Sequence, residues 1–180
     1  MKPTVLILPG LSNSGPLHWQ TLWEQHDPAF KRVQQRDWEN PDCAEWAAAL
    51  EREVEQAGPD VVLVAHSLAC LLVAHWAHVT KRRIKGALLV APPDPEAITF
   101  PEQATGFSAL PREPLPFASI VVCSADDPFG SCEFAAECAA AWGSRLVELG
   151  ALGHINAESG LGRWDQGLQL LASLVGACTC

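Results

Sequence analysis

A serine lies at the junction of two apolar segments, which is the arrangement that a serine nucleophile needs. Ser67 follows the apolar run of residues 60–65 and opens an apolar segment over residues 67–79, with Ala65 two positions before it and Ala69 two positions after it. This is the G-x-S-x-G pattern of a nucleophile elbow, with alanine at both glycine positions. Small residues are needed there because strand and helix cross closely. The alternative is that the serine only caps the helix.

An acid and a histidine follow this serine in the chain order that doubly wound hydrolases use. The apolar run of residues 120–124 leads to Asp127, and the run of residues 146–149 leads to His154. Because the carboxyl ends of parallel strands meet at one edge of a sheet, we expect these side chains to lie beside Ser67. A histidine oriented by a carboxylate can activate a serine hydroxyl for acyl transfer. The spacing therefore predicts Ser67 as nucleophile, Asp127 as acid and His154 as base.

Two adjacent aspartates compete for the role of the acid. Successive side chains of an extended segment point in opposite directions, so only one of Asp126 and Asp127 can face His154. Pro128 follows Asp127 and restricts its backbone to extended conformations. This favours Asp127 as the acid and predicts that Asp126 turns toward solvent or toward a turn N–H.

Two backbone N–H groups are candidates for an oxyanion hole. One belongs to Leu68, directly after the serine. The other belongs to Leu11, in the loop of residues 10–15 (the oxyanion loop) that follows the first apolar run. Gly10 would allow that loop to approach the serine closely. A phosphate-binding loop is a poor alternative here, because no G-K-[ST] sequence follows the glycine.

Several aromatic residues are candidates for binding the substrate. His18 and Trp19 follow the oxyanion loop and could line a pocket, although a packed helix start explains them equally well. Residues 91–117 contain seven prolines and leave the carboxyl end of a strand, where open α/β sheets bind ligands. Phe100 and Phe107 in this segment are candidate contacts for an acyl group. The alternative is that the segment is a surface excursion without a role in binding.

The remaining histidines and the cysteines are interpreted as structural. His66 alternates to the other side of the turn from the serine and is expected to support the site rather than to act as base. His75 and His78 are three residues apart, but no carboxylate or cysteine completes a metal site with them. The seven cysteines are irregularly spaced and form no C-x-x-C pair, which favours buried thiols over disulfides. No metal or organic cofactor is implied.

The elements that must position these residues alternate as in a parallel α/β sheet. Short apolar runs predict six strands, and longer periodic segments predict the helices between them. The expected strands cover residues 4–8, 32–37, 60–65, 84–90, 118–124 and 145–149; the expected helices cover residues 17–26, a segment that opens at Asn40, and residues 67–79, 131–142 and 164–175. The length of 180 residues predicts one α/β domain over residues 1–180.

Composition and charge argue against several classes of partner. The chain has 21 acidic and 12 basic residues, and its longest basic cluster is residues 81–83, so neither nucleic acid nor an anionic membrane surface is expected as a partner. Hydrophobic residues make up 48 % of the chain and charged residues 18 %, which excludes a disordered protein. No apolar run is long enough for a membrane span or a signal peptide, so a cytoplasmic protein is expected.

The chain resembles the small serine hydrolases of α/β-hydrolase fold typified by retinoblastoma-binding protein 9, and in particular a bacterial branch of that family. The resemblance extends over nearly the whole chain and rests on Leu8-Pro9-Gly10, His18-Trp19, Asp37-Trp38, His66-Ser67-Leu68, Leu89-Val90-Ala91-Pro92, Asp127-Pro128, Trp142-Gly143 and Gly153-His154-Ile155-Asn156. It implies six strands in the order 2-1-3-4-5-6, no helical lid, and a Ser67, Asp127 and His154 triad. Family members usually carry glycine where this chain has Ala69.

The residues and the resemblance together predict a serine hydrolase that cleaves a small ester, thioester or amide through an acyl-enzyme. Its partner is then a small-molecule substrate. The alternative is a binding protein on the same fold, with weak or vestigial catalysis, that engages a protein or a small molecule. No motif for a protein partner is visible in the sequence.

Overall fold

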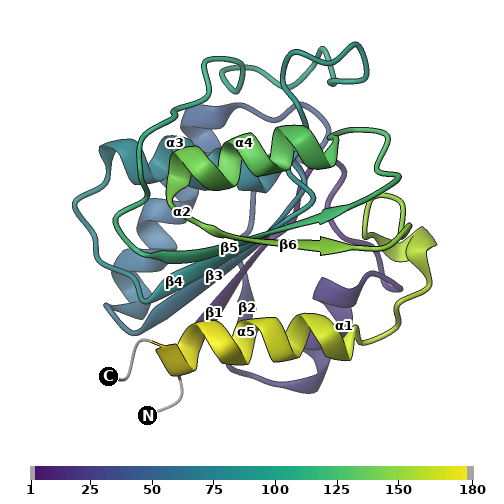
Figure 1. Ribbon diagram of the computed structural model, residues 1–180. Helices are drawn as coiled ribbons and strands as arrows, with labels where there is room; N and C mark the ends of the chain where they lie inside the picture. The colour runs from purple at the N-terminus through teal and green to yellow at the C-terminus, as the bar shows by residue number, and fades with distance from the viewer. Residues whose placement is uncertain (1–2, 178–180) are drawn as a thin grey trace.

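Short runs of aliphatic residues form a parallel sheet at the centre of the molecule (Figure 1). The computed structural model describes residues 3–177. The strands are β1 (Thr4–Leu8), β2 (Phe30–Arg32), β3 (Val61–His66), β4 (Gly86–Val90), β5 (Ala118–Ser124) and β6 (Arg145–Leu149). They lie in the order β2-β1-β3-β4-β5-β6, and all neighbouring strands are parallel. The predicted α/β-hydrolase sheet is confirmed.

Helices cover both faces of this sheet, as parallel strands joined by crossovers require. The helices are α1 (Trp19–His26), α2 (Cys43–Ala57), α3 (Leu68–Val79), α4 (Cys132–Trp142) and α5 (Asp165–Ala177), with a short 3₁₀ turn, η1 (Ala157–Ser159). Figure 1 shows α2, α3 and α4 on one face and α1 and α5 on the other. Each face carries its own core, and the central strands are buried on both sides.

The ends of two helices show how local sequence sets the boundaries. Ser131 accepts the N–H of Phe134 and caps α4, and Gly143 ends that helix with a φ of +67°, both as predicted. The start of α2 was expected at Asn40, but Asp42 is the capping residue and accepts the N–H of Glu45 at 2.9 Å. The carboxylate is the stronger acceptor for an N–H at the positive end of a helix.

The second strand lies earlier in the chain than expected. It covers Phe30–Arg32 instead of residues 32–37, and its pairing with β1 ends where the Val33 N–H donates to Ile7 O at 2.9 Å. The carboxylate of Asp37 then accepts the N–H groups of Glu39 and Asn40, two and three residues later, in a tight turn. A three-residue edge strand is defined by its partner strand, so its own composition does not locate it.

The proline-rich segment 91–117 has neither a helix nor a strand, and its two parts lie in different places. Its first part lies at the carboxyl edge of the sheet. Its second part packs on α2, α3 and α4: Phe107 is fully buried, and the indole of Trp142 donates to Pro111 O at 2.9 Å. The segment is therefore part of the core as well as of the carboxyl edge, and it is not a surface excursion.

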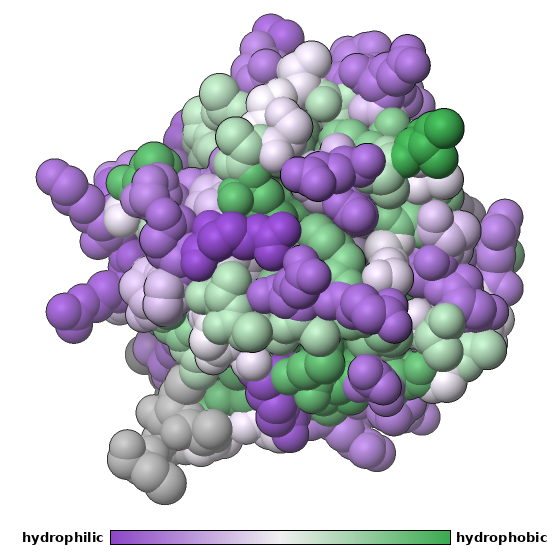
Figure 2. Space-filling model, turned by 45° about the horizontal axis from the view of Figure 1, so that its top comes forward, coloured by the Kyte–Doolittle hydropathy of each residue, from purple (hydrophilic) through white to green (hydrophobic). Residues whose placement is uncertain are grey.

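The surface and the cysteines agree with what the sequence predicts for a globular protein. On the face drawn in Figure 2, hydrophobic residues form small patches between hydrophilic ones. Within residues 3–177, no helix combines the length and apolar character needed to cross a bilayer. The five cysteines described by the structure carry free thiols, four of them buried, as the irregular spacing predicted. Cys178 and Cys180 lie outside the described residues.

Candidate active site

Ser67 lies in a sharp turn between β3 and α3. Its φ of 57° and ψ of −129° are rare for a residue with a side chain, and such strain is typical of a nucleophile elbow. Its side chain makes no capping hydrogen bond to α3, so the capping alternative is wrong. Ala69 is fully buried within the core, which shows that the turn forms with alanine at the second glycine position of the G-x-S-x-G pattern.

A continuous chain of hydrogen bonds joins the three residues that the sequence singled out. His154 Nε2 lies 2.7 Å from Ser67 Oγ, and His154 Nδ1 lies 2.9 Å from both carboxylate oxygens of Asp127. The side chain of Asp127 is 1 % exposed and that of His154 is 10 % exposed. Because a carboxylate accepts, Nδ1 carries the hydrogen, and the Nε2 lone pair is free to accept the serine hydroxyl. This arrangement allows His154 to remove the proton from Ser67.

The loop after β5 positions the carboxylate of Asp127. Asp127 Oδ1 also accepts the N–H of Phe129 at 2.9 Å, so the turn of the loop holds the carboxylate in place. The ring of Phe129 lies with its centroid 4.7 Å from that of His154, in an edge-to-face contact. Phe129 thus packs against the imidazole of His154, a contact that was not predicted from the sequence.

Asp126 holds the loop that carries His154. Its Oδ1 accepts the N–H of Gly153 at 2.7 Å and the hydroxyl of Ser124 at 2.9 Å, and these bonds lower the pKa of the carboxyl group below its usual value. The hydroxyl oxygen of Ser124 in turn accepts the N–H of Leu152 at 2.9 Å. Asp126 therefore bonds to a turn N–H, as expected, but that N–H belongs to the loop directly before His154.

The two N–H groups predicted for an oxyanion hole lie beside the serine. A Cβ added to Gly10 would lie 2.9 Å from Ser67 Cβ and 3.0 Å from His66 O, so only glycine allows this close approach. Leu11 and Leu68 both line the cavity next to the serine. The N–H of Leu11 has no acceptor among residues 3–177, and Leu68 is the first residue of α3, where an N–H lacks an intrahelical partner.

A buried arginine holds the oxyanion loop from outside. Arg32, at the end of β2, donates to Asn13 Oδ1 at 2.7 Å and to Ser14 O at 3.1 Å, and it forms an ion pair with Glu24 at 2.8 Å. Its side chain is only 9 % exposed, so these partners must compensate for the lost hydration of the guanidinium group.

A fully buried glutamine ties the same loop to the sheet. Gln20 Nε2 donates to Leu8 O and to Val64 O, each at 3.1 Å, and Gln20 Oε1 accepts the hydroxyl of Ser14 at 2.7 Å. The oxyanion loop, the end of β1 and the end of β3 are therefore held together by one side chain. Neither Gln20 nor Arg32 was predicted from the sequence, because the role of each depends on partners that are far away in the chain.

A cavity of about 520 Å³ opens beside Ser67 and His154. Its remaining walls come from the oxyanion loop, the first part of segment 91–117 and the loop after His154. They are formed by Leu11, Asn13, Gly15, His18, His66, Leu68, Pro93, Thr99, Phe100, Pro101, Phe129, Asn156, Ala157 and Glu158. The predicted contacts His18 and Phe100 thus line the cavity.

Two predicted substrate contacts are wrong, because both side chains turn into the core. Trp19 is 1 % exposed, and its Nε1 donates to Ile155 O at 2.8 Å, so the ring packs under the site instead of lining it. Phe107 is fully buried, with its ring centroid 6.1 Å from that of Trp46. Neither residue reaches the cavity.

His18 presents an unsatisfied nitrogen next to the site. Its Nδ1 accepts the N–H of Gln20 at 3.2 Å and caps α1, whereas its Nε2 is buried and has no hydrogen-bond partner among residues 3–177. Burial, and then the nearby charges of Arg32 and His154, lower the pKa of His18 to about 4. The ring is therefore neutral at pH 7, and its Nε2 carries the hydrogen.

Acidification should destabilise the folded protein through His18. Since the folded-state pKa is about 4 and the unfolded value about 6.5, the unfolded chain binds more protons between these pH values. The free energy of unfolding should fall by about 3 kcal/mol from pH 6.5 to pH 4 through this residue. His18→Asn retains a capping acceptor, so urea unfolding of this variant should show a correspondingly weaker loss. Equal losses in both proteins would contradict this assignment.

His66 contacts both the backbone and the ring of His154. Its Nε2 donates to His154 O at 2.9 Å, and its ring centroid lies 4.9 Å from that of His154 and 4.7 Å from that of His18. Burial and the neighbouring His154 hold the pKa of His66 well below its usual value, so the ring is neutral. His66 therefore fixes the backbone of His154, in line with the supporting role that its side of the turn predicted.

The other histidine pair has protein partners. His75 Nε2 donates to Phe107 O at 3.2 Å, and His78 Nδ1 lies 3.7 Å from a carboxylate oxygen of Glu113. These contacts agree with the structural interpretation of both residues.

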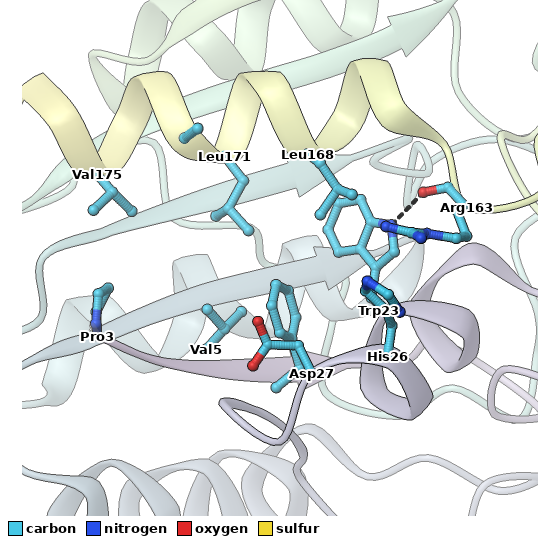
Figure 3. A pocket seen from close by; sticks show the side chains of 11 residues that line it. Pro3, Val5, Trp23, His26, Asp27, Arg163, Leu168, Leu171 and Val175 are labelled. Atoms are coloured by element: carbon cyan, nitrogen blue, oxygen red, sulfur yellow. Dashed lines mark hydrogen bonds between the residues drawn. The ribbon is translucent and has the colours of Figure 1, made fainter.

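A second cavity, of about 370 Å³, lies between α1, α5 and the strands β1 and β2 (Figure 3). Figure 3 shows Val5, Leu171 and Val175 pointing into it, with Trp23 donating to the carbonyl of Arg163 at one end. Its lining residues include neither a hydroxyl nor a thiol group. Of these two cavities, only the one at Ser67 therefore contains a candidate nucleophile.

Comparisons with known proteins agree with this geometry. The model of the serine hydrolase family matches residues 5–173. Among curated protein sequences, none matches the chain. A YdeN-like hydrolase of Pectobacterium atrosepticum is 34 % identical with a TM-score of 0.86, over 97 % of this chain and 91 % of that one.

More distant structures share the fold. The ydeN gene product of B. subtilis is 19 % identical with a TM-score of 0.75, over 96 % of this chain and 98 % of that one. The RedJ thioesterase of Streptomyces coelicolor is 15 % identical with a TM-score of 0.66, over 94 % and 89 %. The family match covers most of the chain, and the chain therefore belongs to the serine hydrolase family, as an esterase-like enzyme of α/β-hydrolase fold.

Proposed function

We propose that Ser67, His154 and Asp127 form a catalytic triad that cleaves a small ester, thioester or amide through an acyl-enzyme. The observation that carries this proposal is the continuous chain of hydrogen bonds, at 2.7 Å and 2.9 Å, from a strained serine to a buried carboxylate. The Ser67 end of this hydrogen-bonded series lies at a cavity of about 520 Å³, and this volume is within the range of small-molecule sites.

In the first half of the reaction, Ser67 Oγ attacks the carbonyl carbon of the substrate while His154 Nε2 takes the hydroxyl proton. The carbonyl oxygen becomes an anion, which the N–H groups of Leu68 and Leu11 stabilise. Asp127 stays ionised and stabilises the imidazolium ring. His154 then gives its proton to the departing oxygen, sulfur or nitrogen, and the acyl group remains on Ser67.

Water completes the cycle. His154 removes a proton from a water molecule, whose oxygen attacks the acyl carbon, and the oxyanion again forms against the same N–H groups. When this intermediate collapses, the bond to Ser67 Oγ breaks and His154 returns the proton to it. The product is a carboxylic acid.

The walls of the cavity support a substrate with an apolar and a polar part. Leu11, Phe100 and Phe129 form apolar contacts for an acyl chain. His18 and Glu158 lie among the polar lining residues. We propose that the Nε2–H of His18, which has no acceptor among residues 3–177, donates to a substrate oxygen after a small shift of the ring.

A fluorophosphonate probe and a panel of p-nitrophenyl esters of graded chain length test the proposed function. The probe should modify one serine, located by peptide mass spectrometry at Ser67, and at least one ester should be hydrolysed without added metal or cofactor. A protein that binds esters but is neither labelled nor able to hydrolyse any of them would favour the alternative of a binding protein.

Phe100→Ala should change the preference for acyl chain length. Since Phe100 lines the cavity, its removal should lower kcat/KM for the preferred ester by about tenfold relative to the acetate ester. Steady-state kinetics across the ester panel measure this.

Phe107→Ala is the matched control. Phe107 is fully buried away from the cavity, so its truncation should cost about 3–5 kcal/mol of stability and leave the order of preference among the esters unchanged. An unchanged preference in Phe100→Ala would remove this residue from the acyl site.

A further inference from the structure

Two thiols outside the proposed triad lie in very close contact. The sulfur atoms of Cys123 and Cys132 are 2.7 Å apart. Cys123 is near the end of β5 and buried, whereas Cys132 is the first residue of α4 and partly exposed. A disulfide bond measures about 2.05 Å, so bond formation requires the two sulfurs to approach by only about 0.65 Å.

The chain between these cysteines carries the acid of the proposed triad. Residues 123–132 include Asp127, which binds His154 Nδ1, and Asp126, which binds the N–H of Gly153. The loop is also packed closely on its other side, because a Cβ added to Gly130 would lie 2.2 Å from Pro92 O. The loop that joins the two cysteines is therefore held at several points, and these contacts keep the two thiols close together.

We propose that Cys123 and Cys132 are a reversible oxidation site, at which hydrogen peroxide or a small-molecule disulfide forms a bond that closes the acid-bearing loop. With peroxide, the Cys132 thiol is oxidised to a sulfenic acid and one water is released. The sulfur of Cys123 then attacks the Cys132 sulfur, the S–S bond forms, and the hydroxyl group leaves with the thiol proton as a second water. An added dithiol reverses the reaction.

The surroundings decide which sulfur reacts first. Burial, followed by the neighbouring Cys132 thiol and the charge of Glu148, raises the pKa of Cys123 far above its usual value. Cys123 is therefore a poor first nucleophile. Cys132 is the more exposed of the two thiols, so the oxidant reaches it first, and Cys123 is already placed to resolve the sulfenic acid.

A metal ion is the competing ligand for this cluster. A carboxylate oxygen of Glu148 and both sulfurs lie within 4.8 Å of one another. Two thiolates on one tetrahedral zinc ion, each at about 2.3 Å, lie roughly 3.8 Å apart. The observed separation of 2.7 Å is shorter than that and is closer to a disulfide than to a pair of zinc ligands.

Closing a loop of ten residues should raise the stability of the protein and leave the rate of ester hydrolysis nearly unchanged. Loop closure of this length should raise Tm by about 5–10 °C. Because the sulfurs need to move by less than an ångström, ester hydrolysis at 25 °C should change by less than about twofold. The bridge itself is detected by mass and does not depend on the proposed triad.

Peptide mapping tests the bridge directly. The reduced protein is treated with a small excess of peroxide, alkylated, and digested with trypsin and a protease that cleaves before aspartate. Cleavage at Arg112, Arg145 and before Asp127 separates Cys123 from Cys132, so the two fragments stay together only if the S–S bond exists. We expect the linked pair, with a mass about two hydrogens below the sum of its reduced parts, and its release by dithiothreitol.

Two variants complete the experiment. Cys132→Ser, at a partly exposed position, should lose both the linked pair and the rise in Tm on oxidation, whereas Cys138→Ala on the same helix should keep both. Three results would overturn the proposal: no linked pair after oxidation, a linked pair without a change in Tm, or one equivalent of zinc that is retained by the untreated protein and lost in Cys132→Ser.

Discussion

Replacing Ser67 with alanine is expected to abolish labelling by a fluorophosphonate and to lower kcat for ester hydrolysis by about five to six orders of magnitude. The variant keeps the cavity, the N–H groups of Leu11 and Leu68, and the imidazole of His154, but no oxygen remains to form the acyl-enzyme. The residual rate should be what substrate binding and the oxyanion hole supply on their own. Steady-state kinetics and intact mass after labelling measure both effects.

Ser108→Ala serves as the matched control, since Ser108 is exposed on the proline-rich segment and does not line the cavity. Its labelling and kcat should equal those of the unmodified protein. Full activity in Ser67→Ala, or a covalent adduct on another serine, would contradict the proposed mechanism.

Asp127→Asn is expected to lower kcat by about four orders of magnitude. The carboxylate accepts the hydrogen on His154 Nδ1, and an amide that turns its NH₂ group toward the ring instead favours the other tautomer. The hydrogen would then sit on Nε2, which could no longer accept the proton of Ser67. The pH–rate profile and kcat of the variant, measured with the best ester of the panel, report this loss.

Asp126→Asn provides the comparison at the adjacent position. The amide oxygen can still accept the N–H of Gly153, so the loop before His154 should keep its place and kcat should fall about tenfold or less. If Asp126→Asn proved the more damaging of the two, the acid of the triad would be Asp126.

The sequence alone was sufficient for the alternation of strands and helices and for the grouping of Ser67, Asp127 and His154, whereas the strand order was implied by the resemblance to the serine hydrolase family. The strands and the grouping depend on signals that lie close together in the chain. Runs of aliphatic residues define buried parallel strands, and a residue that follows such a strand must lie at the carboxyl edge of the sheet. The edge strand β2 carried no such signal, because only its pairing with β1 places it at Phe30–Arg32.

The tertiary structure decided which side chains face the cavity and what holds them. Trp19 and Phe107 were reasonable substrate contacts by position, but the packing of α1 and of the proline-rich segment turns both into the core. Gln20 and Arg32 fix the oxyanion loop through partners up to 44 residues away in the chain. Such contacts join residues whose spacing follows no local period, so only the folded chain brings them within hydrogen-bond distance.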